Sequence, residues 1–115
     1  MLDTAQNSEA VNLYDTDTKG CKEAIRKGGL IMVDFWSKQC GPCRSLMPLL
    51  ADIAKKHPTL CIIKIEIEKN AALADEYEVK SVPSLLLFKD GDYIDRLIGK
   101  APFPIIEDMV IKLSL

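Results

Sequence analysis

The chain has 115 residues, of which 48% are hydrophobic and 28% are charged, and its formal net charge at pH 7 is −2. This length suits one domain with a single core, and the composition is that of an ordinary globular protein. There is no basic excess that would favour nucleic acid or an anionic membrane surface, and no stretch approaches the roughly 20 apolar residues of a membrane-spanning helix.

The chain begins with a polar stretch. Residues 1–10 are expected to form a flexible N-terminal segment, and residues 11–115 a single domain. Residues 1–18 have neither the positive charge nor the apolar run of a secretory signal peptide, so we expect a cytoplasmic protein. In the cytoplasm a cysteine pair is more often catalytic than structural.

The first third of the domain predicts a helix between two strands. Residues 10–14 are expected to form a short edge strand, and residues 15–27 a helix with Asp15 or Thr16 as its N-cap. Residues 30–36 are apolar apart from one carboxylate, a pattern typical of a strand that is covered on both faces. We therefore expect this strand to lie in the centre of the sheet.

The middle third predicts two parallel strands joined by a helix. Apolar residues recur at helical spacing over residues 42–57, and Pro48 is expected to bend this helix without ending it. Residues 60–67 form the next strand, and a helix-sized crossover between two buried strands implies that they are parallel. Asn70 is expected to cap a short helix over residues 70–78.

The last third predicts a hairpin followed by a helix. Strands over residues 84–88 and 93–98 flank the turn signal Asp90-Gly91, so they are expected to be antiparallel. Two prolines then open a C-terminal helix, whose expected inward stripe consists of Ile106, Met109, Val110 and Leu113. The element order βαβαβαββα predicts an α/β fold, a central mixed β-sheet flanked by helices on both faces.

Two cysteines stand where the strand over residues 30–36 gives way to the next helix. At a helix start, positions i and i+3 share one face, so the sulfurs of Cys40 and Cys43 can form a disulfide. Gly41 permits the tight turn, and Pro42 suits the first helical position. Cys40 lies at the helix N-terminus, where free N–H groups and the macrodipole favour its thiolate. We therefore expect Cys40 to be the nucleophile and Cys43, one turn further in, the resolving thiol.

A Cys-x-x-Cys pair is also half of a zinc site, and its spacing alone does not decide between metal and redox chemistry. A four-coordinate zinc site needs two further ligands, and the available Cys21, Cys61 and His57 form no second close pair. The preceding strand and following helix favour the redox interpretation. The other two cysteines are expected in the core, and His57 near a helix C-terminus as a partner of the helix dipole.

Asp34 is a carboxyl group in an otherwise apolar strand. Burial of a carboxylate is costly unless the group is paired, so desolvation is expected to raise its pKa. A carboxylate with a raised pKa can accept the proton that Cys43 must lose during the reaction. The alternative is a partly solvated aspartate at the end of the strand.

Three runs of the chain carry a resemblance to the thioredoxin family: Asp34-Phe35-Trp36, Cys40-Gly41-Pro42-Cys43-Arg44 and Val82-Pro83. The resemblance covers roughly residues 11 to 115 and implies the thioredoxin fold. It implies a protein-disulfide reductase that carries electrons by thiol–disulfide exchange, without a bound cofactor or metal. The implied partners are disulfide-containing proteins and a thioredoxin reductase. We expect a monomer, with no nucleic acid or membrane partner.

The same resemblance assigns further site residues. Lys64 matches the lysine that pairs with the buried aspartate in the family, the alternative being a solvated strand residue. The family pattern implies a cis Val82-Pro83 bond that faces the cysteines and leaves the Val82 backbone free to pair with an extended substrate; the alternative is an ordinary edge-strand proline. Trp36 falls at a groove position but is equally compatible with the core. The whole implied substrate groove consists of Trp36, Gly41, Pro42, Val82, Pro83 and Gly99.

One residue departs from the family pattern. Thioredoxins usually carry a second tryptophan immediately before the nucleophile, and this chain has Gln39 there. We expect this change to affect partner selection and to leave the chemistry intact. Two alternatives stay open: an oxidase or isomerase on the same fold, against which Gly41-Pro42 argues, and a binding module that has lost turnover, with which Gln39 is compatible.

Overall fold

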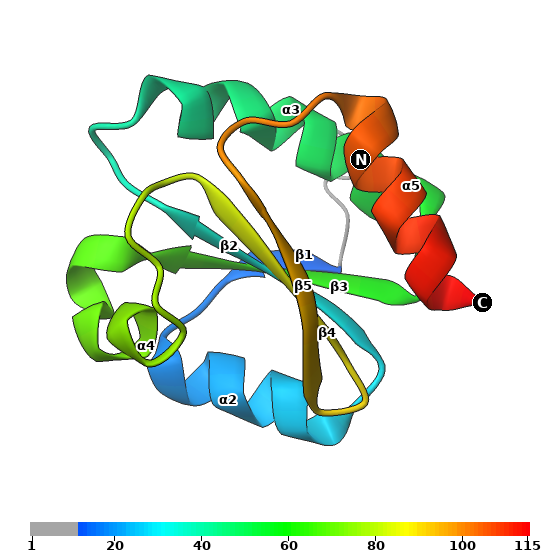
Figure 1. The fold of residues 1–115 in the computed structure, drawn as a ribbon, viewed down its shortest axis with the longest axis horizontal. Helices are drawn as coiled ribbons and strands as arrows, with labels where there is room; N and C mark the ends of the chain where they lie inside the picture. Colours follow the sequence, from blue (N-terminus) through cyan, green and yellow to red (C-terminus); the bar gives the residue numbers. More distant parts are fainter. Residues whose placement is uncertain (1–11) are drawn as a thin grey trace, which may run out of the picture.

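The computed structural model of the protein describes residues 12–115. Five strands form one sheet with helices on both faces (Figure 1), which confirms the mixed α/β fold class expected from the sequence. The elements in chain order are β1 (Leu13–Asp15), α2 (Thr18–Lys27), β2 (Leu30–Trp36), α3 (Gly41–Lys56), β3 (Leu60–Glu66), the 3₁₀ turn η1 (Ile67–Lys69), α4 (Ala71–Glu76), β4 (Ser84–Lys89), β5 (Asp92–Ile98) and α5 (Phe103–Ser114). The expected flexible segment over residues 1–10, and residues 10 and 11 of the expected edge strand, lie outside the described part.

The strands lie in the order β1-β3-β2-β4-β5. β3 runs parallel to both β1 and β2, and β4 runs antiparallel to both β2 and β5. β2 is therefore central, as its sequence, apolar apart from Asp34, predicted. The β4–β5 connection is a two-residue turn in which Asp90 and Gly91 have φ values of 50° and 92°, the left-handed conformation that this tight hairpin requires.

The sheet separates two hydrophobic clusters. Alternate residues of β2 serve the two faces, because successive side chains of a strand point to opposite sides. Ile31, Val33 and Phe35 pack with residues of α2 and α4, whereas Leu30 and Met32 pack with residues of α3 and α5. In Figure 1, α3 and α5 lie above the sheet and α2 and α4 below it. Residue 34 is even-numbered, so it belongs to the face that α3 covers.

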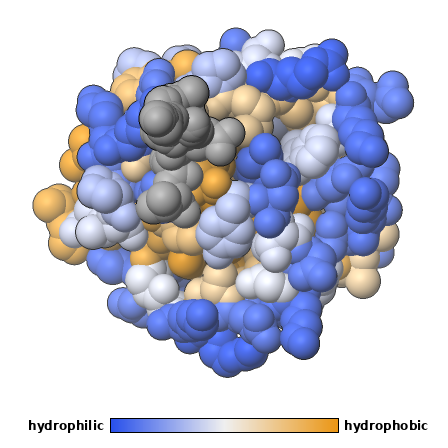
Figure 2. Space-filling model, turned by 180° about the vertical axis from the view of Figure 1, so that it is seen from behind, coloured by the Kyte–Doolittle hydropathy of each residue, from blue (hydrophilic) through white to orange (hydrophobic). Residues whose placement is uncertain are grey.

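The outer surface is mainly polar. Figure 2 shows polar side chains over most of the face seen from behind, with smaller apolar areas between them. Several large apolar side chains are exposed, and the exposed fraction of Ile98, next to Gly99, is 67%. Within residues 12–115, no helix has the length and apolar character needed to cross a membrane.

The long helix α3 continues through Pro48, as its periodic apolar residues predicted. At α2 the prediction of the N-cap was wrong, because Asp17 occupies that position and its side chain accepts a hydrogen bond from the N–H of Gly20 at 2.9 Å. The physical reason is strand pairing. Asp15 belongs to β1, and the N–H of Thr16 still donates to the carbonyl of Lys64 in β3, so the helix begins only after this pairing ends.

Asn70 precedes α4 as predicted, but its side chain makes no capping hydrogen bond to that helix. Its Oδ1 accepts hydrogen bonds from the backbone N–H of Thr18 at 2.9 Å and from the Thr18 hydroxyl at 2.8 Å. Its Nδ2 donates to the carbonyl of Glu66 at 2.9 Å. Asn70 thus satisfies the first N–H of α2 instead, and α4 is shorter than expected.

Candidate active site

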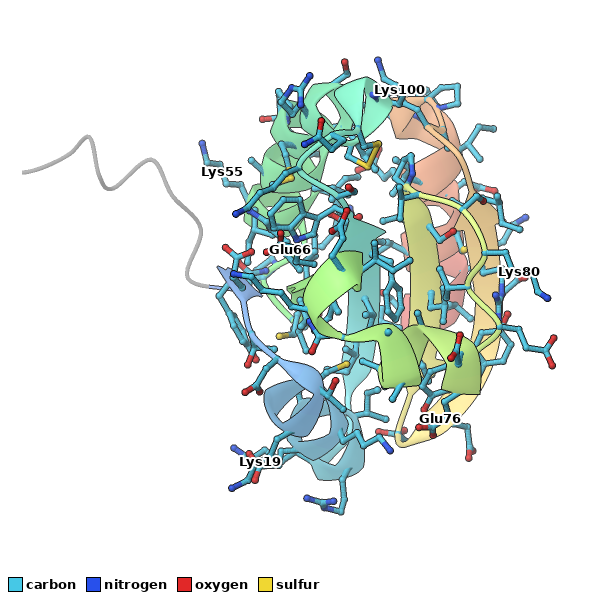
Figure 3. The ribbon with its side chains drawn as sticks, turned by 90° about the vertical axis from the view of Figure 1, so that its left-hand side faces the viewer. Lys19, Lys55, Glu66, Glu76, Lys80 and Lys100 are labelled. Atoms are coloured by element: carbon cyan, nitrogen blue, oxygen red, sulfur yellow. A yellow bond between two sulfur atoms is a disulfide. The ribbon has the colours of Figure 1, made fainter. Side chains whose placement is uncertain are left out.

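Cys40 and Cys43 are joined by a disulfide at the start of α3, with their Cα atoms 5.3 Å apart. Cys40 is the N-cap residue of α3, and Gly41 and Pro42 form its first two positions. The backbone turns from β2 into the helix within four residues, which is why i and i+3 side chains meet here. Figure 3 shows the disulfide at the same end of the molecule as Lys100.

The two cysteines differ in exposure and in hydrogen bonding. Cys43 is buried, with 3% of its surface exposed, whereas Cys40 is half-buried. The N–H of Cys43 donates to the Sγ of Cys40 at 3.1 Å, and the N–H of Arg44 donates to the carbonyl of Cys40. An N–H directed at Sγ stabilises negative charge on that sulfur. The geometry therefore favours a thiolate at Cys40 over one at Cys43.

Asp34 lies in β2 on the sheet face covered by α3. Only 1% of its surface is exposed, and its Oδ1 has no hydrogen-bond partner among the described residues. Burial raises the pKa of Asp34 to about 7; the Lys64 ammonium opposes this rise, and the Asp15 carboxylate adds to it. The expectation of a buried carboxyl group with a raised pKa agrees with this geometry, and the partly solvated alternative does not.

Lys64 is the direct neighbour of Asp34 across the parallel β2–β3 pair. Its ion pair, however, is made with Asp15 of β1, whose Oδ2 lies 3.5 Å from Nζ. The ammonium also lies 5.9 Å from the centre of the Trp36 ring. Lys64 therefore lowers the pKa of Asp34 through its charge alone. Its ion-pair partner is Asp15, which the sequence did not indicate.

Trp36 is the last residue of β2. It is half-buried, so its exposure is compatible both with a position in the substrate groove and with one in the core. It lines a small pocket of about 110 Å³ together with Cys43, Arg44, Met47 and Lys64. Its Nε1 is buried and has no hydrogen-bond partner among residues 12–115. The indole therefore shares a cavity with the buried cysteine of the disulfide.

The loop before β4 reaches the same end of the sheet. The Val82-Pro83 peptide bond is cis, and Pro83 directly precedes a strand that is paired on both sides, so it is not an edge-strand proline. Ser84 pairs with Phe35 of β2, and the N–H of Gly99 donates to the carbonyl of Pro83 at 2.8 Å. The start of β4 and the ends of β2 and β5 therefore lie together.

Contacts that sequence reasoning did not predict hold the segment before Cys40. The hydroxyl of Ser37 donates to the carboxylate of Glu68, and it accepts the N–H of Gln39 at 3.3 Å. The hydrogen bond from Ser37 lowers the pKa of Glu68. Arg44 Nη1 donates to the carbonyl of Lys38 at 3.0 Å. No local sequence signal joins Ser37 to Glu68, since the two residues are 31 positions apart in the chain.

The remaining cysteines lie elsewhere. Cys21 is buried in α2, where desolvation raises its pKa to about 11, and Cys61 is half-buried with its Sγ 3.7 Å from the Tyr14 hydroxyl. His57 is the C-cap residue of α3, and its Nε2 lies 3.0 Å from a carboxylate oxygen of Glu107 in α5. None of these side chains lines the pocket beside Trp36.

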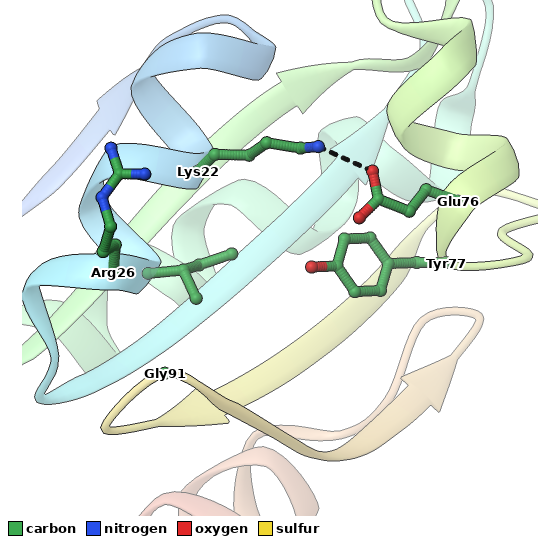
Figure 4. A pocket seen from close by; sticks show the side chains of 6 residues that line it. Lys22, Arg26, Glu76, Tyr77 and Gly91 are labelled. Atoms are coloured by element: carbon green, nitrogen blue, oxygen red, sulfur yellow. Dashed lines mark ion pairs between the residues drawn. The ribbon is translucent and has the colours of Figure 1, made fainter.

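A second pocket lies between α2, α4 and the β4–β5 turn. It is lined by Lys22, Ile25, Arg26, Glu76, Tyr77 and Gly91. Figure 4 shows the Lys22–Glu76 ion pair bridging its rim, with Nζ and Oε1 2.8 Å apart. Neither Cys40 nor Cys43 lines it, so the disulfide and this pocket are separate features.

Comparison with known proteins identifies relatives over almost the whole described chain. The Thioredoxin family model matches residues 12–112. A thioredoxin of Chlamydia pneumoniae is 48% identical over 71 residues, which cover 62% of this chain and 70% of that protein. A thioredoxin of Porphyra purpurea is 35% identical over 98 residues, covering 84% of this chain and 92% of that protein.

Solved structures show the same architecture. A mutant thioredoxin from Halobacterium salinarum NRC-1 has a TM-score of 0.84 and 27% identity, covering 94% of this chain and 93% of that one. Oxidized mitochondrial thioredoxin 3 from Saccharomyces cerevisiae has a TM-score of 0.81 and 24% identity, covering 96% and 100% of the two chains, and shares the fold. These likenesses agree with the thioredoxin fold that the sequence motifs implied. The chain is therefore a thiol–disulfide oxidoreductase of the thioredoxin family.

Proposed function

We propose that this protein acts mainly as a reductant of protein disulfides. The observation that carries the proposal is the unequal cysteine pair at the start of α3, with Cys40 half-buried at the N-cap and Cys43 covered. In the reduced protein, the Cys40 thiolate attacks one sulfur of a substrate disulfide and releases the other as a thiolate. The product is a mixed disulfide between Cys40 and the substrate.

Cys43 then resolves the mixed disulfide. Its thiolate attacks the Sγ of Cys40, forms the Cys40–Cys43 disulfide and releases the second substrate thiolate. The substrate gains two electrons and the cysteine pair loses two. We assign Asp34 as the base that takes the proton from Cys43, because its raised pKa suits proton transfer near neutral pH. Lys64 moderates that pKa through its charge.

A groove around the disulfide is proposed to bind the substrate chain. Its floor consists of Trp36, Gly41, Pro42, Val82, Pro83 and Gly99. Support comes from the topology, which brings the ends of β2 and β5 and the start of β4 together. We propose that the Val82 backbone pairs with an extended substrate segment. Gln39 is exposed beside Cys40, so we propose that it affects which partners bind.

We further propose that the protein is a monomeric electron carrier of the cytoplasm. Its partners in this proposal are disulfide-containing proteins and a thioredoxin reductase that restores the dithiol. The family supports substrates and a reductase of these kinds. Analytical ultracentrifugation at micromolar concentration tests the oligomeric state, and a sedimentation coefficient of a dimer would contradict the monomer.

The decisive test of function is dithiothreitol-driven reduction of insulin. The protein is expected to accelerate precipitation of the free insulin B chain in a concentration-dependent manner, and Cys40→Ser to abolish the acceleration. A wild-type rate equal to the uncatalysed rate would instead support a binding module that lacks turnover. Equilibration against glutathione buffers separates reductant from oxidase or isomerase, since a reductant's disulfide persists only in a strongly oxidising buffer.

A further inference from the structure

Arg96 lies in β5 and reaches across to the end of α4. Its Nη2 donates to the backbone carbonyl of Tyr77 at 2.7 Å, and its Nη1 to that of Glu78 at 3.4 Å. Its Nε donates to the hydroxyl of Tyr93 at 2.8 Å, and the guanidinium carbon lies 5.2 Å from the centre of that ring. All three guanidinium nitrogens are therefore engaged, two of them by one short stretch of backbone.

The end of α4 leaves carbonyls that need a donor. The N–H of Glu78 donates to the carbonyl of Asp75 and that of Val79 to the carbonyl of Ala74, at 3.1 and 2.8 Å. This pair of bonds closes the helix with Glu78 in the left-handed region, at a φ of 55°. The carbonyls of Tyr77 and Glu78 lie beyond this closure, and the guanidinium group satisfies both.

The side chain of Tyr77 is fixed as well. Its ring packs edge-on against Phe88 of β4, with centroids 5.3 Å apart and an interplanar angle of 80°. Figure 4 shows this ring between α2 and the β4–β5 hairpin. Because the carbonyl is held by β5 and the ring by β4, Tyr77 is a fixed point from which the following loop departs.

The loop that follows α4 is also held where it leads into β4, by the residue that follows β5. The N–H of Gly99 donates to the carbonyl of Pro83 at 2.8 Å, and the hydroxyl of Ser84 donates to the carbonyl of Ser81 at 2.8 Å. Residues 78–83, here called the recognition loop, are thus attached at their entry through Arg96 and at their exit through Gly99. Between these attachments Val82 is half-buried, and its two predecessors are exposed.

We propose that Arg96 is a positioning residue for substrate binding. By attaching the entry of the recognition loop to β5, it sets where the Val82 backbone stands relative to the Cys40–Cys43 pair. This inference rests on the proposed function, in which that backbone pairs with the substrate. Lysine cannot replace arginine here, because one ammonium group does not reproduce a planar fork that serves several acceptors at once.

The test compares two oxidants that differ in size. Pre-reduced wild type and Arg96→Lys are mixed with insulin or with 5,5′-dithiobis(2-nitrobenzoic acid). The temperature is kept well below the Tm of either protein. Oxidised protein is counted by mass after acid quenching and alkylation. We expect the second-order rate constant for insulin to fall about tenfold in Arg96→Lys, because the bound geometry is displaced. The small reagent needs only the Cys40 thiolate, so its rate constant should stay within about twofold of wild type.

Two further variants serve as controls. Arg26→Lys makes the same substitution at an exposed arginine of α2 and should leave both rate constants unchanged. Tyr93→Phe removes one acceptor of Arg96 while keeping the ring, so it should lower only the insulin rate, and by less. Hydrogen exchange should accelerate at the amides of the recognition loop in Arg96→Lys and not in Arg26→Lys.

The outcomes separate the inference from the proposal beneath it. A wild-type protein that reacts with the small reagent but not with insulin overturns the proposed function, and this inference with it. If wild type reduces insulin and Arg96→Lys does so at the same rate, only the positioning role is overturned. Equal losses with both oxidants also overturn it, because Arg96 would then act on the thiolate or on the fold as a whole.

Discussion

At the scale of single residues, the proposed mechanism depends on a carboxyl group that is kept out of water. Asp34 has 1% of its surface exposed, and burial raises its pKa to about 7. A group with this pKa exchanges a proton readily at neutral pH, which an ordinary aspartate does not. The same burial has a cost, because the charged form is poorly solvated in the folded protein.

Asp34→Asn is expected to stabilise the fold at neutral pH and to slow resolution of mixed disulfides. The folded pKa of about 7 lies above the ordinary value of 3.8, so the stabilising contribution of the protonated group is present below about pH 4. It is lost as the pH rises through 7. Asparagine carries no such charge, and the stability difference should reach on the order of 4 kcal/mol near pH 8.

Chemical denaturation of both proteins in the oxidised state, at intervals from pH 4 to pH 8, measures this difference. The matched control is Asp52→Asn, which removes an exposed carboxyl group from α3 and should track wild type throughout. If the curves for Asp34→Asn and wild type ran parallel over the whole range, Asp34 would not be a buried acid with a raised pKa.

Trp36 should report the redox state of the cysteine pair. It is the only tryptophan of the chain, and it lines the same small pocket as Cys43. Because disulfides quench nearby indoles, emission from the oxidised protein should be weaker and should rise on reduction by dithiothreitol. Cys43→Ser, which cannot form the disulfide, should show no rise. Identical emission spectra of reduced and oxidised wild type would contradict the proximity of the two groups.

Some of these residue properties could be predicted from the sequence, and others could not. The raised pKa of Asp34 follows from its apolar neighbours alone, since burial is the main cause. The ion pair of Lys64 with Asp15 could not be predicted in the same way. It depends on the register of β1 against β3, in which these two residues are direct neighbours, and register is set by the whole sheet.

At the scale of helices and strands, the structure depends on polar contacts between segments far apart in the chain. Asn70 is the clearest case, because it is buried and joins the start of α2 to the end of β3. Its Oδ1 serves both the N–H and the hydroxyl of Thr18. A buried amide that makes its hydrogen bonds contributes to stability. Removing the amide leaves its buried donors and acceptors without hydrogen bonds, which lowers stability.

Asn70→Ala should therefore lower the free energy of unfolding by about 2–3 kcal/mol. Thr18→Val removes the hydroxyl and keeps the N–H, so its cost should be about 1 kcal/mol. In a double-mutant cycle measured by urea denaturation, Thr18→Val should cost less when Asn70 is already alanine. Strict additivity of the two single changes would show that the Thr18–Asn70 contact contributes nothing.

Element type was predictable wherever the signal is local. The apolar run of β2, the periodic residues of α3 around Pro48 and the Asp90-Gly91 turn each predicted the element that forms. Element ends were less predictable, because their partners are distant. The start of α2 is decided by pairing of β1 with β3 and by Asn70, which lies 52 residues from Thr18 in the chain.

At the scale of the whole molecule, one end of the sheet assembles the site. The parallel pair β2–β3 brings Asp34 beside Lys64, and the antiparallel pairs place the start of β4 next to the ends of β2 and β5. The disulfide at the start of α3 follows directly from the end of β2. In the proposed function, a partner protein that presents a disulfide to Cys40 therefore meets elements from most of the chain at once.

Cys43→Ser should convert the protein from a catalyst of turnover into a trap for its partners. In this variant Cys40 still lies at the helix N-terminus, and its Sγ still accepts the N–H of residue 43. Its thiolate is therefore expected to attack a substrate disulfide as before. The internal thiol that releases the product is gone, and the mixed disulfide lasts until an external thiol arrives.

Non-reducing gels of a cell extract test this expectation. Cys43→Ser should carry bands that dithiothreitol removes, whereas Cys40→Ser should carry few, because Cys43 is covered. Equal capture by the two variants would reverse the assigned order of the cysteines, and capture by neither would favour a binding module over a reductase.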